Sequence, residues 1–243
     1  MNLPEKNALA LLEKEILSLQ GFKSLPTKDY IPIGFRPIEK AFPHAQFPIG
    51  CVHEFLTLSP EDASATNGFI AGLLSNRMQR GGACLWISAS RTLFPAALNM
   101  YGIAPHQIVF IDLKKEKDVL YATEEALKCN KLVALFSELN NISFKASRRL
   151  QLAAEKSRVT CFLLRRPPQH ANTIAAVSRW RITPLASALC DGMPGVGFPR
   201  WNVELLKVRN GKPGRWIIEW SGEGFTEVKD NIGVREEEKR KTV

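Results

Sequence analysis

Short apolar runs alternate with amphipathic segments through the middle of the chain, between residues 51 and 164. The apolar runs have the length of buried strands, and apolar residues recur at helical spacing in the segments between them. The predicted strands are 51–58, 83–88, 108–113, 132–137 and 159–164, and the predicted helices are 66–80, 93–101, 116–129 and 144–156. Such alternation is typical of a mostly parallel sheet with helices on both faces, so we expect an α/β fold.

The pattern changes after Pro167 and Pro168, where polar and apolar residues begin to alternate. Three alternating segments predict further strands: 175–182, 201–208 and 215–220. We expect them to be antiparallel strands at the C-terminal edge of the sheet. The Gly/Pro-rich stretch 191–199 predicts a loop.

Four regions follow from these patterns. Residues 1–24 hold an amphipathic helix, because Leu9, Leu12, Ile16 and Leu19 share one helical face, and it covers either its own sheet or a neighbouring protein. Residues 25–48 are a Pro-rich connector and residues 49–225 are the core. Residues 226–243 are charged and poor in apolar residues, so we expect a flexible tail.

Composition excludes several classes of protein. The 243 residues are 45% hydrophobic and 23% charged, and no apolar run approaches the about 18 residues that span a membrane. The N-terminus carries acids within its apolar stretch and has no basic start, so it is not a secretory signal, and we expect a cytoplasmic protein. The five cysteines are scattered and lack metal-ligand spacing, so we interpret them as reduced thiols and expect no metal site.

The turn after the first core strand, residues 59–66, has the spacing of a phosphate-binding loop without its chemistry. Ser59 and Ser64 occupy the two glycine positions, Ala65 the lysine position and Thr66 the hydroxyl position, so only the threonine is intact. We therefore expect neither ATP hydrolysis nor a required cofactor. Weak ATP or ADP binding stays open, because a helix N-terminus near Thr66 would attract anions. Ser64 and Thr66 are otherwise explained as simple helix N-caps.

The surroundings of this turn resemble the RecA family. The segment FPIGCVHEF (47–55) resembles the strand before the RecA nucleotide loop, Ser59-Pro60-Glu61 is similar to its Gly-Pro-Glu, and CLWISASR (84–91) resembles its second strand. The resemblance implies a RecA-like, P-loop NTPase-type fold. It also places Ser90 where working ATPases carry the glutamate that orients water, and Ser137 where they carry a magnesium-supporting carboxylate. Neither serine supplies that chemistry, which again argues against hydrolysis.

A nearer resemblance is to the ImuA family. Its hallmarks are similar to FPIGCVHEF, to SRRLQLAAEKSRVTCFLLR (147–165) and to WNVELLKVRNGKPGRWIIEW (201–220), in that order. The resemblance implies a non-catalytic accessory factor of damage-induced (SOS) translesion DNA synthesis. The partners it implies are an ImuB-type homologue of Y-family polymerases, a DnaE-type polymerase and RecA.

Basic residues concentrate between 141 and 181, where one acid, Glu155, accompanies nine cations. On the predicted helix 144–156, Phe144 and Leu152 are expected to pack inward with Leu150 and the alanines. The predicted binding surface comprises Lys145, Arg148, Arg149, Lys156, Arg165, Arg166, Arg179 and Arg181. Such a surface suits single-stranded DNA or an acidic partner protein, or it is merely a solvated face.

Two rival functions remain at this stage. One is a divergent ATPase or recombinase, against which the serine at position 90 counts. The other is a SulA-like cell-division inhibitor that binds FtsZ, which also implies a RecA-like fold without ATPase activity. The basic segment and the long antiparallel end favour the repair factor.

Overall fold

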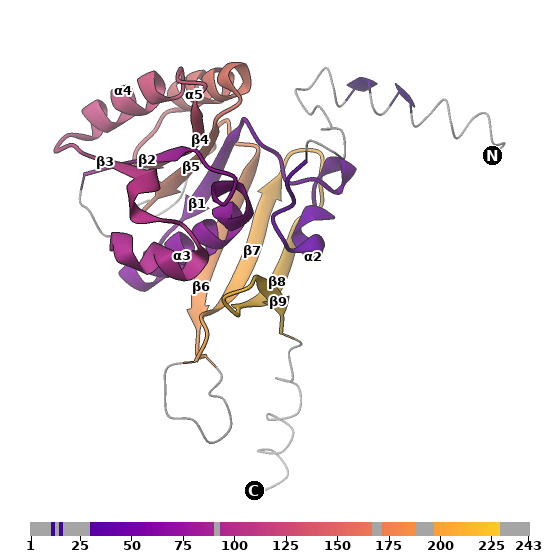
Figure 1. The fold of residues 1–243 in the computed structure, drawn as a ribbon. Coiled ribbons are helices and arrows are strands. Elements are labelled where there is room, and N and C mark those ends of the chain that lie inside the picture. Colours follow the sequence, from indigo (N-terminus) through magenta and orange to yellow (C-terminus); the bar gives the residue numbers. More distant parts are fainter. Residues whose placement is uncertain are drawn as a thin grey trace, which may run out of the picture.

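The computed structural model describes residues 11–12, 15–16, 30–89, 93–166, 172–187 and 197–228. In these residues the predicted strands form one mixed sheet in the order β3-β2-β4-β5-β1-β6-β7-β8-β9 (Figure 1). The elements in chain order are α2 (Arg36–Glu39), η1 (Pro43–Ala45), β1 (Val52–Leu56), α3 (Pro60–Met78), β2 (Ala83–Ser88), η2 (Pro95–Tyr101), η3 (Pro105–Gln107), β3 (Ile108–Asp112), α4 (Glu116–Ala126), β4 (Leu132–Glu138), α5 (Phe144–Ser157), β5 (Thr160–Arg165), β6 (Ser178–Leu185), β7 (Arg200–Val208), β8 (Gly214–Trp220) and β9 (Phe225–Glu227).

The strands β1 to β5 are parallel, as predicted from their alternation with helices. The prediction that 175–182 is an antiparallel strand was wrong on one side: β6 pairs in parallel with β1 and antiparallel with β7. The chain crosses over after β5 and returns beside β1, so β6 joins the parallel half of the sheet to the antiparallel strands β7, β8 and β9.

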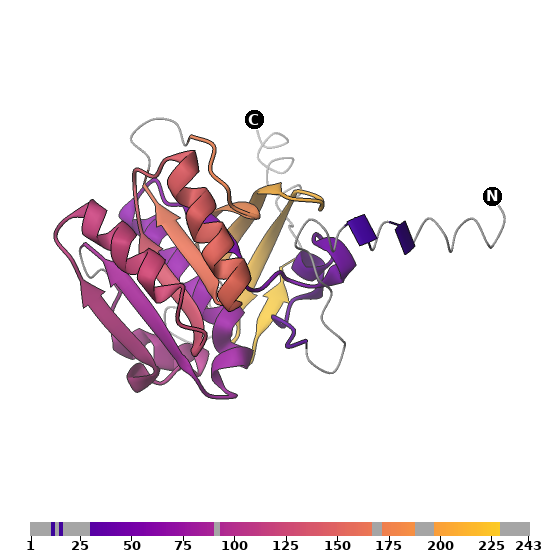
Figure 2. The same cartoon turned by 90° about the horizontal axis from the view of Figure 1, so that it is seen from above.

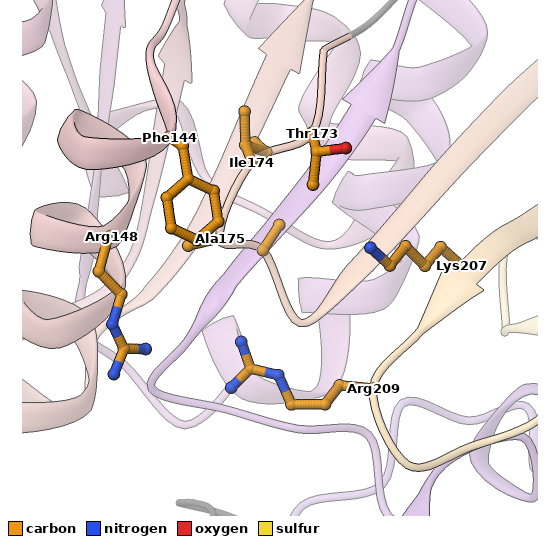
Figure 3. Close-up of a pocket in the computed structure, with 8 residues that line it drawn as sticks. Phe144, Arg148, Thr173, Ile174, Ala175, Lys207 and Arg209 are labelled. Atoms are coloured by element: carbon orange, nitrogen blue, oxygen red, sulfur yellow. The ribbon is translucent and has the colours of Figure 1, made fainter.

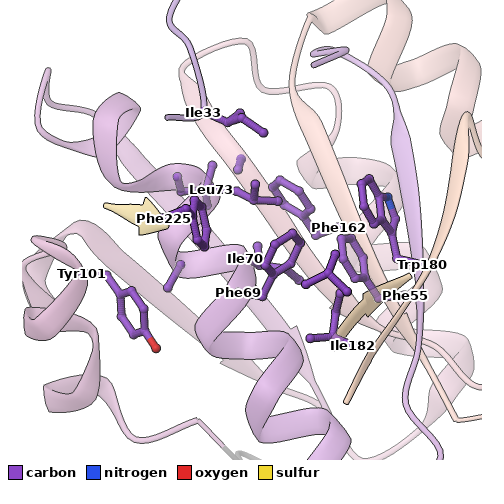
Figure 4. Packing of buried hydrophobic residues seen from close by; sticks show 14 of the residues in the cluster. Ile33, Phe55, Phe69, Ile70, Leu73, Tyr101, Phe162, Trp180, Ile182 and Phe225 are labelled. Carbon is purple, nitrogen blue, oxygen red and sulfur yellow. The ribbon is translucent and has the colours of Figure 1, made fainter. Parts of the chain in front are cut away.

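Helices cover the two faces of the parallel half. Helix α3 packs on one face, and α4 and α5 lie side by side on the other (Figure 2). The first core is rich in aromatic rings, among them Phe55, Phe69 and Trp180 (Figure 4). The second is aliphatic and includes Val52, on the opposite side of β1 from Phe55. This burial on both faces explains why the central strands read as continuous apolar runs.

Much of the expected connector belongs to the core. Ile33, Phe35, Ile38, Phe42 and Phe47 are all buried in the aromatic cluster. Sequence patterning missed this because these residues lie between prolines and follow neither strand nor helical spacing.

Two local predictions also differ from the structure. The segment expected as a helix at 93–101 is the 3₁₀ helix η2. Residues 226 and 227, expected to belong to the tail, are in the added strand β9, whose Phe225 is buried. Phe225 packs where α3 carries Gly72, since a Cβ there would lie 2.5 Å from its Cζ atom. Residues 229–243 of the expected tail and residues 191–196 of the expected loop lie outside the described residues.

The predicted N-terminal helix falls largely outside the described part of the chain. Of its apolar residues, Leu12 and Ile16 are described; both are helical and exposed.

A buried histidine, His53, links β1 to its neighbours. Its Nε2 lies 2.9 Å from the carbonyl oxygen of Pro48, and its Nδ1 lies 2.6 Å from Oγ of Ser178. Because a carbonyl only accepts, Nε2 carries the proton, and Nδ1 accepts from the hydroxyl of Ser178. The ring also stacks on Phe47 at 4.5 Å between centroids. Burial lowers the pKa of His53 from 6.5 to about 4, so the folded protein holds it neutral.

We expect the stability of the protein to fall as pH drops from 6.5 to 4. In that window the unfolded chain protonates His53 and the folded protein does not, so unfolding takes up a proton and is favoured as the pH falls. The two pKa values are about 2.5 pH units apart, which gives a loss of about 3 kcal/mol at pH 4. Urea unfolding at several pH values, with His53→Gln as the non-titrating control, measures this; parallel curves for the two proteins would refute it.

Candidate functional site

The turn after β1 is a helix start, not a phosphate loop. Helix α3 begins at Pro60, and the extended Ser59 is its N-cap, whose Oγ accepts from the backbone N–H of Asp62 at 3.1 Å. The prediction that this helix begins at Thr66 was therefore wrong by six residues. No loop of backbone N–H groups surrounds a space for phosphates between Ser59 and Thr66, because the intervening residues are helical.

The donors at this helix start are already occupied. Pro60 has no N–H group, and the N–H of Asp62 is bound to Ser59. Glu61 receives a hydrogen bond from its own backbone N–H and a second from the Ser59 hydroxyl, and these lower the pKa of its carboxyl group. The Asp62 carboxylate in turn accepts from the N–H of Leu58 at 3.2 Å. An incoming phosphate would meet two carboxylates and no free donor, so the anion site expected at this end is closed.

The remaining positions of the expected loop lie in the second helical turn. Ser64 is exposed, whereas Ala65 and Thr66 are buried against the core, so neither Ser64 nor Thr66 is an N-cap. The Thr66 hydroxyl is buried and has no hydrogen-bond partner. Thr66, the one residue that matches the phosphate-loop pattern, thus points into protein.

Ser90 and Ser137 are the two positions where the resemblance to RecA implies a lost catalytic acid, and the structure describes one of them. Ser90 lies outside the described residues. Ser137 is buried on β4 and shares a hydrogen bond of 2.6 Å with the Thr123 hydroxyl of α4. Its side chain therefore faces the α4 side of the sheet, away from α3.

Five of the predicted basic residues are exposed as expected. Lys145, Arg148, Arg149 and Lys156 project from α5, and Arg166 follows β5. Arg149 is paired with Glu124 of α4 at 3.0 Å, with both partners partly in water. The predicted inward packing of Phe144 and Leu152 was wrong: they are 56% and 48% exposed, so the outer face of α5 mixes apolar and basic groups.

Two predicted surface arginines are instead structural. Arg165 is 2% exposed and lies 2.5 Å from one carboxylate oxygen of Glu54, whose other oxygen lies 2.6 Å from Nε of Arg179. Both arginines also bind Asn172, at its side-chain and backbone oxygens. Glu54 therefore neutralises and positions them inside the fold, and they are not free for DNA or a partner. Arg181 is half-exposed and lies 3.9 Å from Glu204.

A hollow of about 330 Å³ opens beside α5 (Figure 3). Arg148 approaches it from α5, and two cations that sequence reasoning missed, Lys207 and Arg209, approach from the end of β7. The backbone N–H of Arg209 binds the carbonyl of Val177 at 2.8 Å, which brings this turn beside the crossover that precedes β6. Counting charge along the chain could not find this group, because its members are about 60 residues apart.

The comparisons identify the chain's relatives. Two proteins named ImuA, from Caulobacter vibrioides strains NA1000 / CB15N and ATCC 19089 / CIP 103742 / CB 15, are 32% identical to this chain over 201 residues. The match covers 78% of this chain and 82% of each relative. The chain belongs to the ImuA family. No protein-family model matches it.

A solved structure gives this ImuA-family chain its fold class. The RadB recombinase superimposes with a TM-score of 0.53 at 10% identity, over 76% of this chain and 93% of RadB. At 10% identity the structural similarity supports a shared fold and no shared function. It confirms the predicted RecA-like α/β fold with a mostly parallel sheet and antiparallel strands at the C-terminal edge.

The described part of the chain lacks two kinds of feature, a membrane-spanning helix and a metal-binding cluster. It contains no helix with both the length and the apolar character to cross a bilayer. It also contains no group of three metal-ligating side chains of the His, Cys, Asp or Glu types.

Proposed function

We propose that this ImuA-family protein is a non-catalytic accessory factor of a mutagenic translesion DNA synthesis assembly and works by binding other proteins. The observation that carries the proposal is the closed start of α3. Where a RecA-like ATPase would need a phosphate cradle, this chain has a helix whose first turn is capped by Ser59 and filled by the carboxylates of Glu61 and Asp62.

The buried side chains behind this turn support the same view. Ala65 supplies no charge to a transferred phosphoryl group, and Thr66 is enclosed by protein. Restoring one lysine would therefore not restore a site, since the first-turn N–H groups are already bound, those of Glu61 and Asp62 by side-chain oxygens and that of Ala63 by the Ser59 carbonyl. These features support a divergent ATPase less well than a non-catalytic adaptor.

The exposed basic face of α5 gives the adaptor a binding surface. Arg148 and Lys145 are exposed and form no ion pair with a described residue, while Arg149 shares only a partly solvated pair with Glu124. The partners that the family implies are an ImuB-type polymerase homologue, a DnaE-type polymerase and RecA. Binding of one of these to α5, without nucleotide, is the function we propose.

The test is a pull-down of the purified protein with an ImuB-type partner, with and without RecA and with and without ATP. We expect the complex to form without ATP, and we expect Arg148→Glu with Arg149→Glu to reduce the retained partner about tenfold or more, because the charge complementarity is reversed. The matched control is Lys114→Glu with Lys117→Glu, the same double charge reversal at two exposed residues at and just before the start of α4.

Two results would contradict the proposal. Saturable ATP hydrolysis by the wild-type protein would favour the divergent ATPase. Failure to retain either the ImuB-type partner or RecA, together with retention of FtsZ, would favour the SulA-like cell-division inhibitor.

A further inference from the structure

The hollow beside α5 has an apolar floor and a basic rim. Ile174 and Ala175 of the crossover line its floor, and the ring of Phe144 stands at its side (Figure 3). Ala176, the next residue of the crossover, also lines the hollow. Its volume of about 330 Å³ lies at the low end of the range for ligand pockets, about 300–1,000 Å³. It therefore has room for one large side chain or a group of similar size.

The three cations at the rim are electrostatically unsatisfied. Arg148, Lys207 and Arg209 come from two different elements, and none forms an ion pair with a residue that the structure describes. Among the described residues that line the hollow, none is acidic. Like charges gathered around a low-dielectric wall raise the local positive potential, so the hollow favours a ligand that carries negative charge.

The apolar surface extends along α5 beyond the hollow. Phe144, Arg148 and Leu152 are spaced by four residues and so lie on one stripe of the helix, with Phe144 and Leu152 about half exposed. An arginine between exposed apolar side chains is the composition of a protein-binding hot spot. Exposing the apolar side chains of this stripe to water is unfavourable. A partner that covers the stripe would therefore be stabilised by hydrophobic burial as well as by charge pairing.

Nucleic acid fits the same features less well. Proteins that bind single strands stack successive bases on several aromatic rings along a basic groove. Here Phe144 is the one ring among the described residues that line the hollow, and the segment's other two aromatic side chains, Phe162 and Trp180, are buried. The floor is aliphatic, which suits a side chain better than a base.

We propose that this hollow binds an acidic peptide segment of a partner protein, with one apolar side chain seated on Ile174 and Ala176 and flanking carboxylates bound by Arg148, Lys207 and Arg209. The inference rests on the proposed adaptor function and adds the recognition chemistry. It also extends the binding surface from α5 to the β7–β8 turn, which the charge pattern alone did not include.

The direct test is fluorescence anisotropy with a defined probe: a fluorescein-labelled peptide of aspartates interrupted by one phenylalanine. We expect the full-length protein to bind it with micromolar affinity. Replacing the peptide's phenylalanine by serine should weaken binding about tenfold, because the apolar anchor is lost. Arg209→Glu should weaken it by a similar factor, and raised salt should weaken it further.

A second variant separates the pocket from general charge. Ala176→Phe fills the hollow without changing any charge, so it should also weaken the peptide about tenfold or more, while Lys117→Glu on α4 should leave affinity within about twofold. Thermal unfolding of each variant checks that it folds like the wild type. The proposal is overturned if Ala176→Phe leaves peptide binding unchanged, or if oligothymidylate of equal charge binds more tightly than the peptide and competes for the same arginine.

The two proposals fail in different ways. If an ImuB-type partner is retained equally by the wild type and by Ala176→Phe, the adaptor function stands and the pocket proposal is wrong. If the peptide binds the wild type and not the variants, while no mutagenesis partner is retained, the pocket proposal stands and the adaptor function is wrong.

Discussion

The Glu54→Gln variant should be less stable than the wild type by about 3–5 kcal/mol. Glu54 is 1% exposed and is shared by Arg165 and Arg179, which bind one carboxylate oxygen each. Removing its charge leaves Arg165 buried without a counter-ion, which is costly because a buried charge has lost its solvation by bulk water. The loss is expected to be far larger than that of a surface ion pair.

Urea unfolding monitored by tryptophan fluorescence measures this loss. The control is Glu204→Gln, which breaks the longer and half-exposed pair with Arg181 and should cost less than about 1 kcal/mol. Replacing Arg165 by Met in the Glu54→Gln background should recover part of the loss, because the unpaired buried charge is then removed. Equal effects of Glu54→Gln and Glu204→Gln would show that the buried group is not the determinant we describe.

This ion group also shows what charge patterning along a sequence cannot see. Arg165 and Arg166 are adjacent and equally basic in the sequence, yet one is buried and the other exposed. The difference is the register of β5, which turns Arg165 towards Glu54, a residue 111 positions earlier. A count of basic residues correctly predicted that α5 projects cations, and it could not predict which arginines meet a buried acid.

Periodicity predicted most of the parallel sheet, because the central strands β1, β4 and β5 are largely buried on both faces and read as continuous apolar runs. The start of α3 was harder. Its first turns, from Pro60 to Thr66, are polar and small, so no hydrophobic repeat marks them as helix. The stronger signal was available in Ser59-Pro60-Glu61, an N-cap followed by a proline at the first helical position and an acid in the first turn. The resemblance to a phosphate loop took precedence over it.

The hollow beside α5 lay beyond prediction for a different reason. Its floor is the irregular crossover before β6, and its rim includes the end of β7. Pairing these segments required the position of β6 between β1 and β7, which no local pattern specifies. The same strand carries the residue whose loss should affect the fold most.

Trp180 on β6 belongs to the aromatic core (Figure 4). It is fully buried and stacks on Phe55 at 5.9 Å between centroids, with an angle of 7° between the rings. Phe69 of α3 lies 6.0 Å away, and the indole N–H donates to Oγ of Ser178 at 2.7 Å. The side chain therefore packs β6 against both the parallel half of the sheet and its covering helix.

We expect Trp180→Ala to cost about 3–5 kcal/mol, because it removes one of the largest fully buried side chains and leaves a cavity that Phe55 and Phe69 cannot close. Trp180→Phe keeps a ring and loses mainly size and the indole donor, so it should cost roughly 1–2 kcal/mol. Urea unfolding followed by circular dichroism measures both losses of stability, since the substitutions alter the fluorescence signal itself.

Because β6 joins the two halves of the sheet, the slope of the unfolding free energy against urea concentration is informative as well. An unchanged slope with a lower midpoint means that the halves still unfold together, and that Trp180 contributes only packing. A reduced slope in Trp180→Ala would mean that the strands β7 to β9, and with them Lys207 and Arg209, separate from the core before it unfolds. A loss below about 1 kcal/mol would contradict the central role assigned to this ring.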